Sequence, residues 1–350
     1  MADKLKILIV DDSRTSRQLM VRVIETTDDM QVIGEAVDGR DAVKKVNRLK
    51  PDLVLMDIIM PDVDGLEATR QIMRTTPVPI VLITASLESY ETDIAFKALR
   101  AGALTVRQKP GGIGDQREIR ALQNTLRAMS EVEVIHHFSR NEKHSSGEVI
   151  EIDPGALSDR PEPKIVAIAA STGGPAALSD VLRTLPGNYP LPVVIVQHIA
   201  SDFIHSLSSW FQTVSNMPIT IAVPGEHPQP GVVYIAPGDA HLFFDKGRRF
   251  RLDGDRNGRP HMPSADVLFH SVAQSYGAEA IGVILTGMGS DGAEGMESMY
   301  HAGAFTIAQD KATSVVFGMP HEAIERRVVS QIAPINEVAS VLTDLAKIRS

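Results

Sequence analysis

The first 130 residues alternate between apolar runs typical of buried strands and amphipathic stretches typical of helices. The strand-like runs are LKILIV (5–10), QVIGEA (31–36), DLVLMDI (52–58), IVLITA (80–85) and ALTVRQK (103–109). Ser13 is positioned to cap a helix that carries Leu19, Met20, Val23 and Ile24 on one face, and further helices are expected near 40–49, 65–74, 89–101 and 116–129. Continuous apolar strands separated by helices predict a doubly wound parallel sheet built from five βα units.

The same rhythm returns at Lys164 with different content. KIVAIAAS (164–171) and LPVVIVQHI (191–199) flank an expected helix near 175–185, and IGVILTG (281–287) and AFTIAQD (304–310) are again strand-like. Between them, MPITIAV, GVVYIAP and HLFFD (217–245) are short strands separated by Pro and Gly, which favours an antiparallel β section. The predicted fold class is therefore α/β with two doubly wound domains. These are a five-stranded (βα)5 domain at 1–130 and a mainly parallel α/β domain at 164–350 with a β-rich insertion.

Residues 131–163 interrupt the rhythm and predict a linker. The stretch is polar, and its end is rich in Pro and Asp. His136, His137 and His144 lie in it, but without a carboxylate or thiol framework they indicate a solvated linker rather than a metal site.

Composition narrows the functional classes. A chain of 350 residues with 43% hydrophobic and 23% charged residues is expected to form two globular domains. There is no cysteine, so covalent catalysis would need another nucleophile. The net charge of -9 disfavours nucleic acid as a partner. No apolar run is long enough to insert into a membrane, and the first residues do not resemble a signal peptide, so a cytoplasmic location is expected.

Polar residues gather at the predicted carboxyl ends of the first sheet. Asp11 and Asp12 follow the first strand, Asp57 ends the third, Thr84 ends the fourth, and Lys109 closes the fifth. Three carboxylates at one edge would repel each other, and Mg²⁺ relieves this by taking oxygen ligands. Lys109 and Thr84 could then neutralise a phosphoryl group on Asp57. Each residue alone could be a solvated strand end, but their joint occurrence favours a site.

With these residues, the first domain resembles a response-regulator receiver. The stretches that carry the resemblance are VDDS (10–13), MDIIMPDVDG (56–65) and QKP (108–110). The family implies phosphorylation of Asp57 by a histidine kinase, with Mg²⁺ held by Asp11, Asp12, Asp57 and the carbonyl of Ile59. Val106 departs from the family, which usually has an aromatic residue there, so switching through an aromatic ring is not expected.

A second group of residues follows strands of the second domain. Ser171 ends a buried strand directly before Gly173, Gly174 and Pro175, a sequence that allows a tight turn into a helix. This is typical of a nucleophile presented at a helix N-terminus, although Ala169 occupies the first glycine position of the G-x-S-x-G pattern.

His198 and Asp291 complete a possible acyl-transfer site. His198 ends the next buried strand, and Asp291 lies in a glycine-rich loop after another. A Ser/His/Asp set is defined by geometry rather than by chain order. Taken singly, the three residues could be a helix cap, a structural histidine and a turn residue, and only the combination favours a hydrolase. His241, His261 and His270 are alternative bases, and His261 is expected to line the site.

These stretches make residues 164–345 similar to the catalytic domain of chemotaxis protein-glutamate methylesterases. The matching segments are AASTGGP, VQHI, HMPSADVLF (261–269), LTGMGSDGA and SVVFGMP (314–320). The resemblance implies catalytic roles for Ser171, His198 and Asp291, oxyanion contacts from the backbone near Thr172 and Met288, and no cofactor in this domain. The implied substrate is the glutamate methyl ester in the methylated cytoplasmic region of chemoreceptors, and some members also deamidate glutamine.

Together, the two resemblances predict a hydrolase that is activated by phosphorylation. We expect the receiver to cover the active-site mouth until phosphorylation shifts the population toward an open state. Two alternatives remain: a receiver joined to a non-catalytic output, and the same fold acting in a signalling pathway other than chemotaxis. The size and strand content of the second domain argue against the first alternative.

Overall fold

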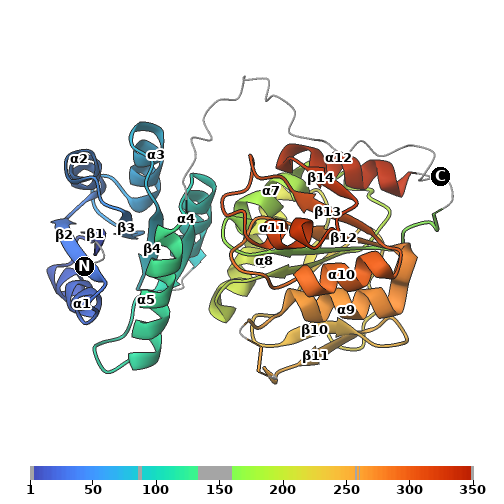
Figure 1. Ribbon diagram of the computed structural model, residues 1–350. Helices are drawn as coiled ribbons and strands as arrows, with labels where there is room; N and C mark the ends of the chain where they lie inside the picture. Colours follow the sequence, from blue (N-terminus) through green and yellow to red (C-terminus); the bar gives the residue numbers. More distant parts are fainter. Residues whose placement is uncertain (1–3, 86–88, 133–159, 257, 260, 348–350) are drawn as a thin grey trace. The chain divides into compact units, whose positions relative to one another are not determined.

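The computed structural model describes residues 4–85, 89–132, 160–256, 258–259 and 261–347. The chain divides into two compact units, Met1–Lys143 and His144–Ser350. Each unit contains its own parallel sheet (Figure 1). Most of the predicted linker, together with His136, His137 and His144, lies outside the described residues.

The first unit is the predicted sequence of five βα pairs. Its strands are β1 (Leu5–Val10), β2 (Met30–Ala36), β3 (Leu53–Asp57), β4 (Ile80–Thr84) and β5 (Thr105–Gln108), in the sheet order β2-β1-β3-β4-β5. Its helices are α1 (Arg14–Glu25), α2 (Gly39–Leu49), α3 (Gly65–Thr75), α4 (Ser89–Arg100) and α5 (Gln116–Ser130). Ser13 caps α1 as expected, since its side chain accepts from the backbone of Ser16. All strand pairs are parallel, so their carboxyl ends share one edge.

The second unit is built on a seven-stranded parallel sheet. Its strands, in the order β14-β13-β12-β6-β7-β9-β8, are β14 (Gln331–Ala333), β13 (Phe305–Gln309), β12 (Ala280–Ile284), β6 (Ile165–Ala170), β7 (Val193–Gln197), β9 (Val233–Ile235) and β8 (Ile219–Ile221). The helices are α7 (Gly174–Thr184), α8 (Ile204–Val214), α9 (Ala265–Tyr276), α10 (Ala293–His301), α11 (Met319–Glu325) and α12 (Ile335–Ala346), with short 3₁₀ turns at Ser201–Phe203 and Gly277–Glu279. Helix α7 packs against α8 and α12, and α10 packs against α9 and α11, so helices form two layers around the sheet (Figure 1).

The expected antiparallel section at 217–245 is only partly correct. Strands β8 and β9 pair in parallel with each other, and β9 pairs in parallel with β7, so they extend the main sheet. Only β10 (His241–Phe244) is antiparallel, in a two-stranded hairpin with β11 (Phe250–Asp253). The hairpin packs on α9, where Phe244, Phe250 and Tyr276 join the core. Pro and Gly separated these strands in the sequence, but they did not determine the direction of pairing.

Candidate active site

The three sequence-predicted residues of the second unit follow three adjacent central strands. Ser171 comes after β6, His198 after β7 and Asp291 after β12, and β6 pairs with both of the other strands. Backbone bonds hold these strand ends in register: Ser171 N donates to Thr286 O at 3.0 Å, and His198 N donates to Ala170 O at 3.0 Å. After β6 the sheet grows through β7 on one side, and β12 later adds on the other side of β6. This reversal of strand order is a switch point of the kind where parallel sheets bind ligands.

The turn after Ser171 depends on two glycines. Gly173 has φ +76°, and a Cβ there would lie 2.5 Å from Cβ of Val315. A Cβ on Gly174 would lie 2.1 Å from Oε1 of Gln197. The backbone can therefore turn sharply and start α7 at once, which leaves half-buried Ser171 at a helix N-terminus. This location places positive backbone groups near an oxygen nucleophile.

His198 and Asp291 form a direct pair. Nε2 of His198 lies 2.8 Å from Oδ2 of Asp291, and each side chain is 9% exposed. An ionised carboxylate can only accept, so Nε2 of His198 carries the proton. Nδ1 of His198 is buried and has no hydrogen-bond partner among the described residues. The free base nitrogen of this ring is therefore Nδ1.

Asp291 is also held at the start of α9. Its carboxylate accepts from Ser264 Oγ at 2.7 Å, Ala265 N at 2.7 Å and Asp266 N at 3.3 Å. Burial alone would raise the pKa of Asp291, but the hydrogen bond from His198, with the bonds from Ala265 and Ser264, holds this pKa well below its usual range. Asp291 therefore stays ionised beside the imidazole.

Gln197 connects the backbone at Ser171 with the backbone at His198. The sequence patterns did not identify it as a site residue. Its buried side chain donates from Nε2 to the carbonyl oxygens of Ser171 at 2.8 Å and His198 at 2.9 Å. One amide therefore ties together the backbone after β6 and the backbone after β7. The only available signal was a polar residue at the end of an otherwise apolar strand.

The other histidines lie in different surroundings. The ring of His261 stacks on that of His198, with centroids 4.5 Å apart and an interplanar angle of 9°. Burial and the neighbouring His198 lower the pKa of His261, which favours its uncharged form beside the pair. His241 Nδ1 instead accepts from the backbone of Ser264 at 3.1 Å, and His270 Nδ1 contacts Ser298 Oγ at 2.7 Å.

Thr172 and Met288, the predicted oxyanion-binding region, lie in the loops beside Ser171. The carbonyl of Thr172 accepts from Thr286 Oγ1 at 3.0 Å, which fixes the loop after β6 against the loop after β12. Met288 is half-buried in that second loop. Their role toward an oxyanion stays a prediction.

In the first unit, the predicted acidic residues come together. One ligand oxygen from each of Asp11, Asp12 and Asp57 lies within 4.8 Å of the others. Lys109 Nζ bonds both Asp11 Oδ2 and Asp57 Oδ2 at 2.7 Å. Burial raises the pKa of Asp57 to about 6, against the lowering effect of Lys109. The carboxylate set fits a hard divalent cation, since it is rich in oxygen and short of balancing charge.

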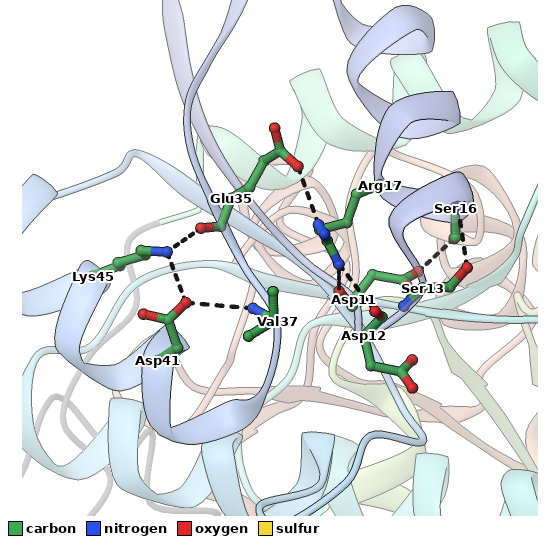
Figure 2. A network of polar contacts seen from close by, with 9 residues as sticks. All are labelled: Asp11, Asp12, Ser13, Ser16, Arg17, Glu35, Val37, Asp41 and Lys45. Carbon is green, nitrogen blue, oxygen red and sulfur yellow. Dashed lines mark hydrogen bonds and ion pairs between the residues drawn. The ribbon is translucent and has the colours of Figure 1, made fainter.

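A second layer of contacts orients this cluster (Figure 2). The guanidinium of Arg17 donates to the carbonyls of Asp11 at 2.7 Å and Asp12 at 3.0 Å, and to the carboxylate of Glu35 at 3.1 Å. The backbone of Ser13 and the hydroxyl of Ser16 both donate to the Asp11 carboxylate, while the Asp12 side chain is exposed. Asp11 is therefore held by several hydrogen bonds, and the exposed carboxylate of Asp12 is accessible to an ion.

Three further predicted positions flank the cluster. Thr84 is buried at the end of β4, and its carbonyl accepts from the backbone of Lys109 at 2.8 Å. Ile59, two residues after Asp57, is exposed. Val106 is buried within β5, at the position where receivers usually have an aromatic ring.

The chain therefore contains two units of different class. The first is a receiver-like (βα)5 unit, and the second is an α/β unit with a Ser/His/Asp arrangement at its switch point. Residues 7–122 match the response regulator receiver domain, and residues 166–342 match CheB methylesterase. The chain belongs to the CheB methylesterase family.

Two relatives match the chain over almost its whole length. The chain is 41% identical to protein-glutamate methylesterase/protein-glutamine glutaminase 1 of Syntrophus aciditrophicus, with 98% of each chain covered. It is 40% identical to protein-glutamate methylesterase/protein-glutamine glutaminase 4 of Myxococcus xanthus, with 97% of each covered. The crystal structure of the Thermotoga maritima CheB methylesterase catalytic domain aligns with a TM-score of 0.51 at 38% identity, over 53% of this chain and all of that one.

Proposed function

We propose that this chain is a phosphorylation-activated hydrolase that removes methyl esters from glutamate side chains of chemoreceptors. Family membership and the names of the whole-length relatives support the reaction class. The observation that carries the proposal is the His198–Asp291 pair beside Ser171, at the carboxyl ends of three adjacent strands. In this proposal residues 1–130 are the receiver, 131–163 the linker and 164–350 the catalytic domain.

The proposed reaction is acyl transfer through Ser171. Nδ1 of His198 takes the hydroxyl proton as Ser171 Oγ attacks the ester carbonyl carbon, and Asp291 stabilises the resulting imidazolium through Nε2. The carbon–oxygen bond to the methoxy group breaks, and the methoxy oxygen takes the proton from His198 and leaves as methanol. Water then attacks the acyl-enzyme with the same base, which frees the glutamate carboxylate and restores Ser171.

Backbone N–H groups near Thr172 and Met288 are proposed to stabilise the negative charge on the tetrahedral intermediate. Ser171 lies at the N-terminus of α7, whose partial positive charge favours the same anion. This arrangement requires no cofactor in the catalytic domain.

The same acyl-enzyme can form from a glutamine side chain. In that case the amide nitrogen takes the proton from His198 and leaves as ammonia. The names of both relatives include a protein-glutamine glutaminase, which supports this second reaction.

In the receiver, Asp57 is proposed to accept phosphate from a histidine kinase. Asp11, Asp12, Asp57 and the carbonyl of Ile59 would hold Mg²⁺, which supplies positive charge at this acidic edge. Lys109 and Thr84 would neutralise the phosphoryl oxygens.

Among the described residues, the structure contains no helix with the length and apolar character of a membrane span. We propose a cytoplasmic location because the proposed substrate region is cytoplasmic, and we propose neither a nucleic-acid partner nor membrane insertion.

The test is methanol release from methylated receptor membranes by the wild type and by Ser171→Ala, with a small phosphodonor and Mg²⁺ present. We expect the variant to fold normally and to lose activity, because the hydroxyl that attacks the ester is gone. A folded variant that still releases methanol at the wild-type rate would remove Ser171 from the mechanism.

A further inference from the structure

Two carboxylates link the first turns of α9 and α10, and each accepts hydrogen bonds from the backbone of the other helix. Asp291, just before α10, accepts from the backbone of Ala265 and Asp266 at the start of α9. In return, Oδ1 of Asp266 accepts from Gly292 N at 2.9 Å and Gly295 N at 2.7 Å, at the start of α10. Each helix is therefore capped by an acidic residue from the other helix or its leading loop.

This exchange replaces a cap that α10 lacks. Gly292 is the N-cap residue of α10, has φ +98° and carries no side chain that could bond the first turn. The two helices also approach closely, since a Cβ on Gly295 would lie 2.5 Å from Cβ of Phe269 and 3.0 Å from Cα of Asp266. The bonds from Gly292 and Gly295 to Asp266 therefore add to the bonds of Asp291 itself in fixing the Asp291 loop against α9.

We propose that Asp266 is a positioning residue for the reaction: its bonds to Gly292 and Gly295 hold Asp291 against Nε2 of His198. Within the described part of the chain no hydrogen bond or ion pair joins Asp266 to His198 or Ser171, so Asp266 acts through Asp291. This inference deepens the proposed function and rests on it for its kinetic part.

The charge of Asp266 is separable from its hydrogen bonds. Burial, together with the neighbouring Asp291, raises the pKa of Asp266 to about 6, against the lowering effect of the bonds from Gly295 and Gly292. The other titratable groups that face Asp291 are His198, His241 and His261. Asp266→Asn removes the charge but keeps an amide oxygen that can accept both N–H bonds, whereas Asp266→Ala removes both.

Asp245 provides a matched control in the same unit. Its carboxylate also accepts from two backbone groups, Gly247 N at 2.8 Å and Arg249 N at 3.1 Å. These bonds lie in the turn of the β10–β11 hairpin. Asp245→Ala therefore removes two backbone bonds of the same kind, together with an ion pair to Arg251, without touching the Asp291 loop.

The experiment measures kcat and KM for methanol release by the full chain with phosphodonor, and thermal unfolding of each variant. A displaced catalytic group commonly loses about 100-fold in rate, so we expect Asp266→Ala to lose roughly 10- to 100-fold in kcat with little change in KM. Asp266→Asn should retain most of the rate. Asp245→Ala should unfold at a lower temperature and keep the wild-type kcat.

A second readout does not depend on activity. The His198 Nε2 proton, bonded to a carboxylate, should give a low-field proton resonance in the wild type, Asp266→Asn and Asp245→Ala, and lose it in Asp266→Ala. If folded Asp266→Ala keeps both this resonance and the wild-type kcat, Asp266 is only a helix cap and the inference is wrong. An Asn variant as slow as the Ala variant would overturn the hydrogen-bond route.

If Asp266→Ala does not fold, Asp266→Glu takes its place. The extra methylene keeps the charge and the acceptor but displaces the α10 N-terminus, so kcat should fall and the resonance should shift. A wild-type rate and spectrum in this variant would contradict the inference. Failure of the wild type to release methanol would instead contradict the proposed function and leave the resonance test of Asp266 intact.

Discussion

The two ring nitrogens of His198 have different surroundings. Nε2 is bonded to Asp291, and Nδ1 is the nitrogen without a partner among the described residues. In chymotrypsin-like proteases the assignment is the reverse, with Nδ1 on the carboxylate and Nε2 as the base. The chemistry tolerates the exchange because either nitrogen can accept a proton once the other is held by an acid.

Asp291→Asn should therefore reduce methanol release strongly. An amide can donate to Nε2, which would favour the tautomer protonated on Nδ1 and remove the proposed base. In the chymotrypsin-like template the equivalent change costs about 10⁴-fold in kcat. The measurement is kcat in the presence of phosphodonor, with Asp245→Asn as the control. A loss smaller than about tenfold, or 1.4 kcal/mol, would show that Asp291 is only a turn residue.

Asp57→Asn should abolish phosphate incorporation from a small phosphodonor in Mg²⁺, because an amide does not form an acyl phosphate.

The same substitution, Asp57→Asn, should stabilise the receiver against unfolding in metal-free buffer. Burial raises the pKa of Asp57 from 3.8 to about 6, so the folded state holds its proton more tightly than the unfolded state. Receiver stability should then fall as pH rises from about 4 through 6, and the Asn variant should lack this loss, worth up to about 3 kcal/mol.

Both readouts of Asp57→Asn have a clear contrary outcome. Undiminished labelling of the variant would place the phosphoacceptor elsewhere. A denaturation midpoint at pH 7 below that of the wild type would mean that the Lys109 ion pair outweighs the burial of Asp57.

At the scale of elements, strand order brings the site together. His198 and Asp291 are 93 residues apart in the chain, yet β7 and β12 both pair with β6. The connection from β6 to α7 then fixes where Ser171 lies. Its conformation requires a residue without Cβ at Gly173, because φ is positive and Val315 fills the space.

Gly173→Ala should lower both stability and activity. The left-handed conformation alone costs about 1–2 kcal/mol for an L-residue, and the overlap with Val315 adds to it. Gly231→Ala is the matched control, since φ there is +75° but the nearest atom to a new Cβ, the carbonyl of Tyr189, lies at 3.5 Å. We expect both variants to unfold at lower temperature and only Gly173→Ala to lose methanol release. Equal activity of the two would show that the turn does not position Ser171.

At the scale of the whole molecule, each unit has its own sheet, its own core and its own set of polar residues at the strand carboxyl ends. The proposed regulation requires the receiver to hold hydrolase activity down until Asp57 is phosphorylated. A free-energy bias of about 1.4 kcal/mol is enough for tenfold repression.

A fragment that begins near Pro154 should therefore release methanol faster than the unphosphorylated full chain. The phosphorylated full chain should approach or exceed the rate of the fragment. The comparison uses the same receptor membranes, with thermal unfolding to establish that the fragment is folded. A folded fragment no faster than the unphosphorylated chain would rule out inhibition by covering, and the receiver would then have to activate the catalytic domain directly.

Local patterns were sufficient to predict the α/β class and to locate Ser171, His198 and Asp291 after buried strands, which is where the structure has them. Buried parallel strands are continuous apolar runs, so a polar residue at the end of such a run is visible without any knowledge of its neighbours. Pairing direction is not visible in this way, which is why β8 and β9 were expected in an antiparallel section and lie in the parallel sheet.

Only the tertiary structure decided which atoms of these residues meet. The choice of Nδ1 as the free nitrogen of His198, the amide of Gln197 between two strand ends, the stacking of His261 and the carboxylate exchange of Asp266 and Asp291 each join segments distant in the chain. Hydrogen bonds and ring contacts act over a few ångströms and depend on orientation. A sequence pattern therefore determines which side chains reach the sheet edge, and the packing of α9 and α10 around that edge determines their chemistry.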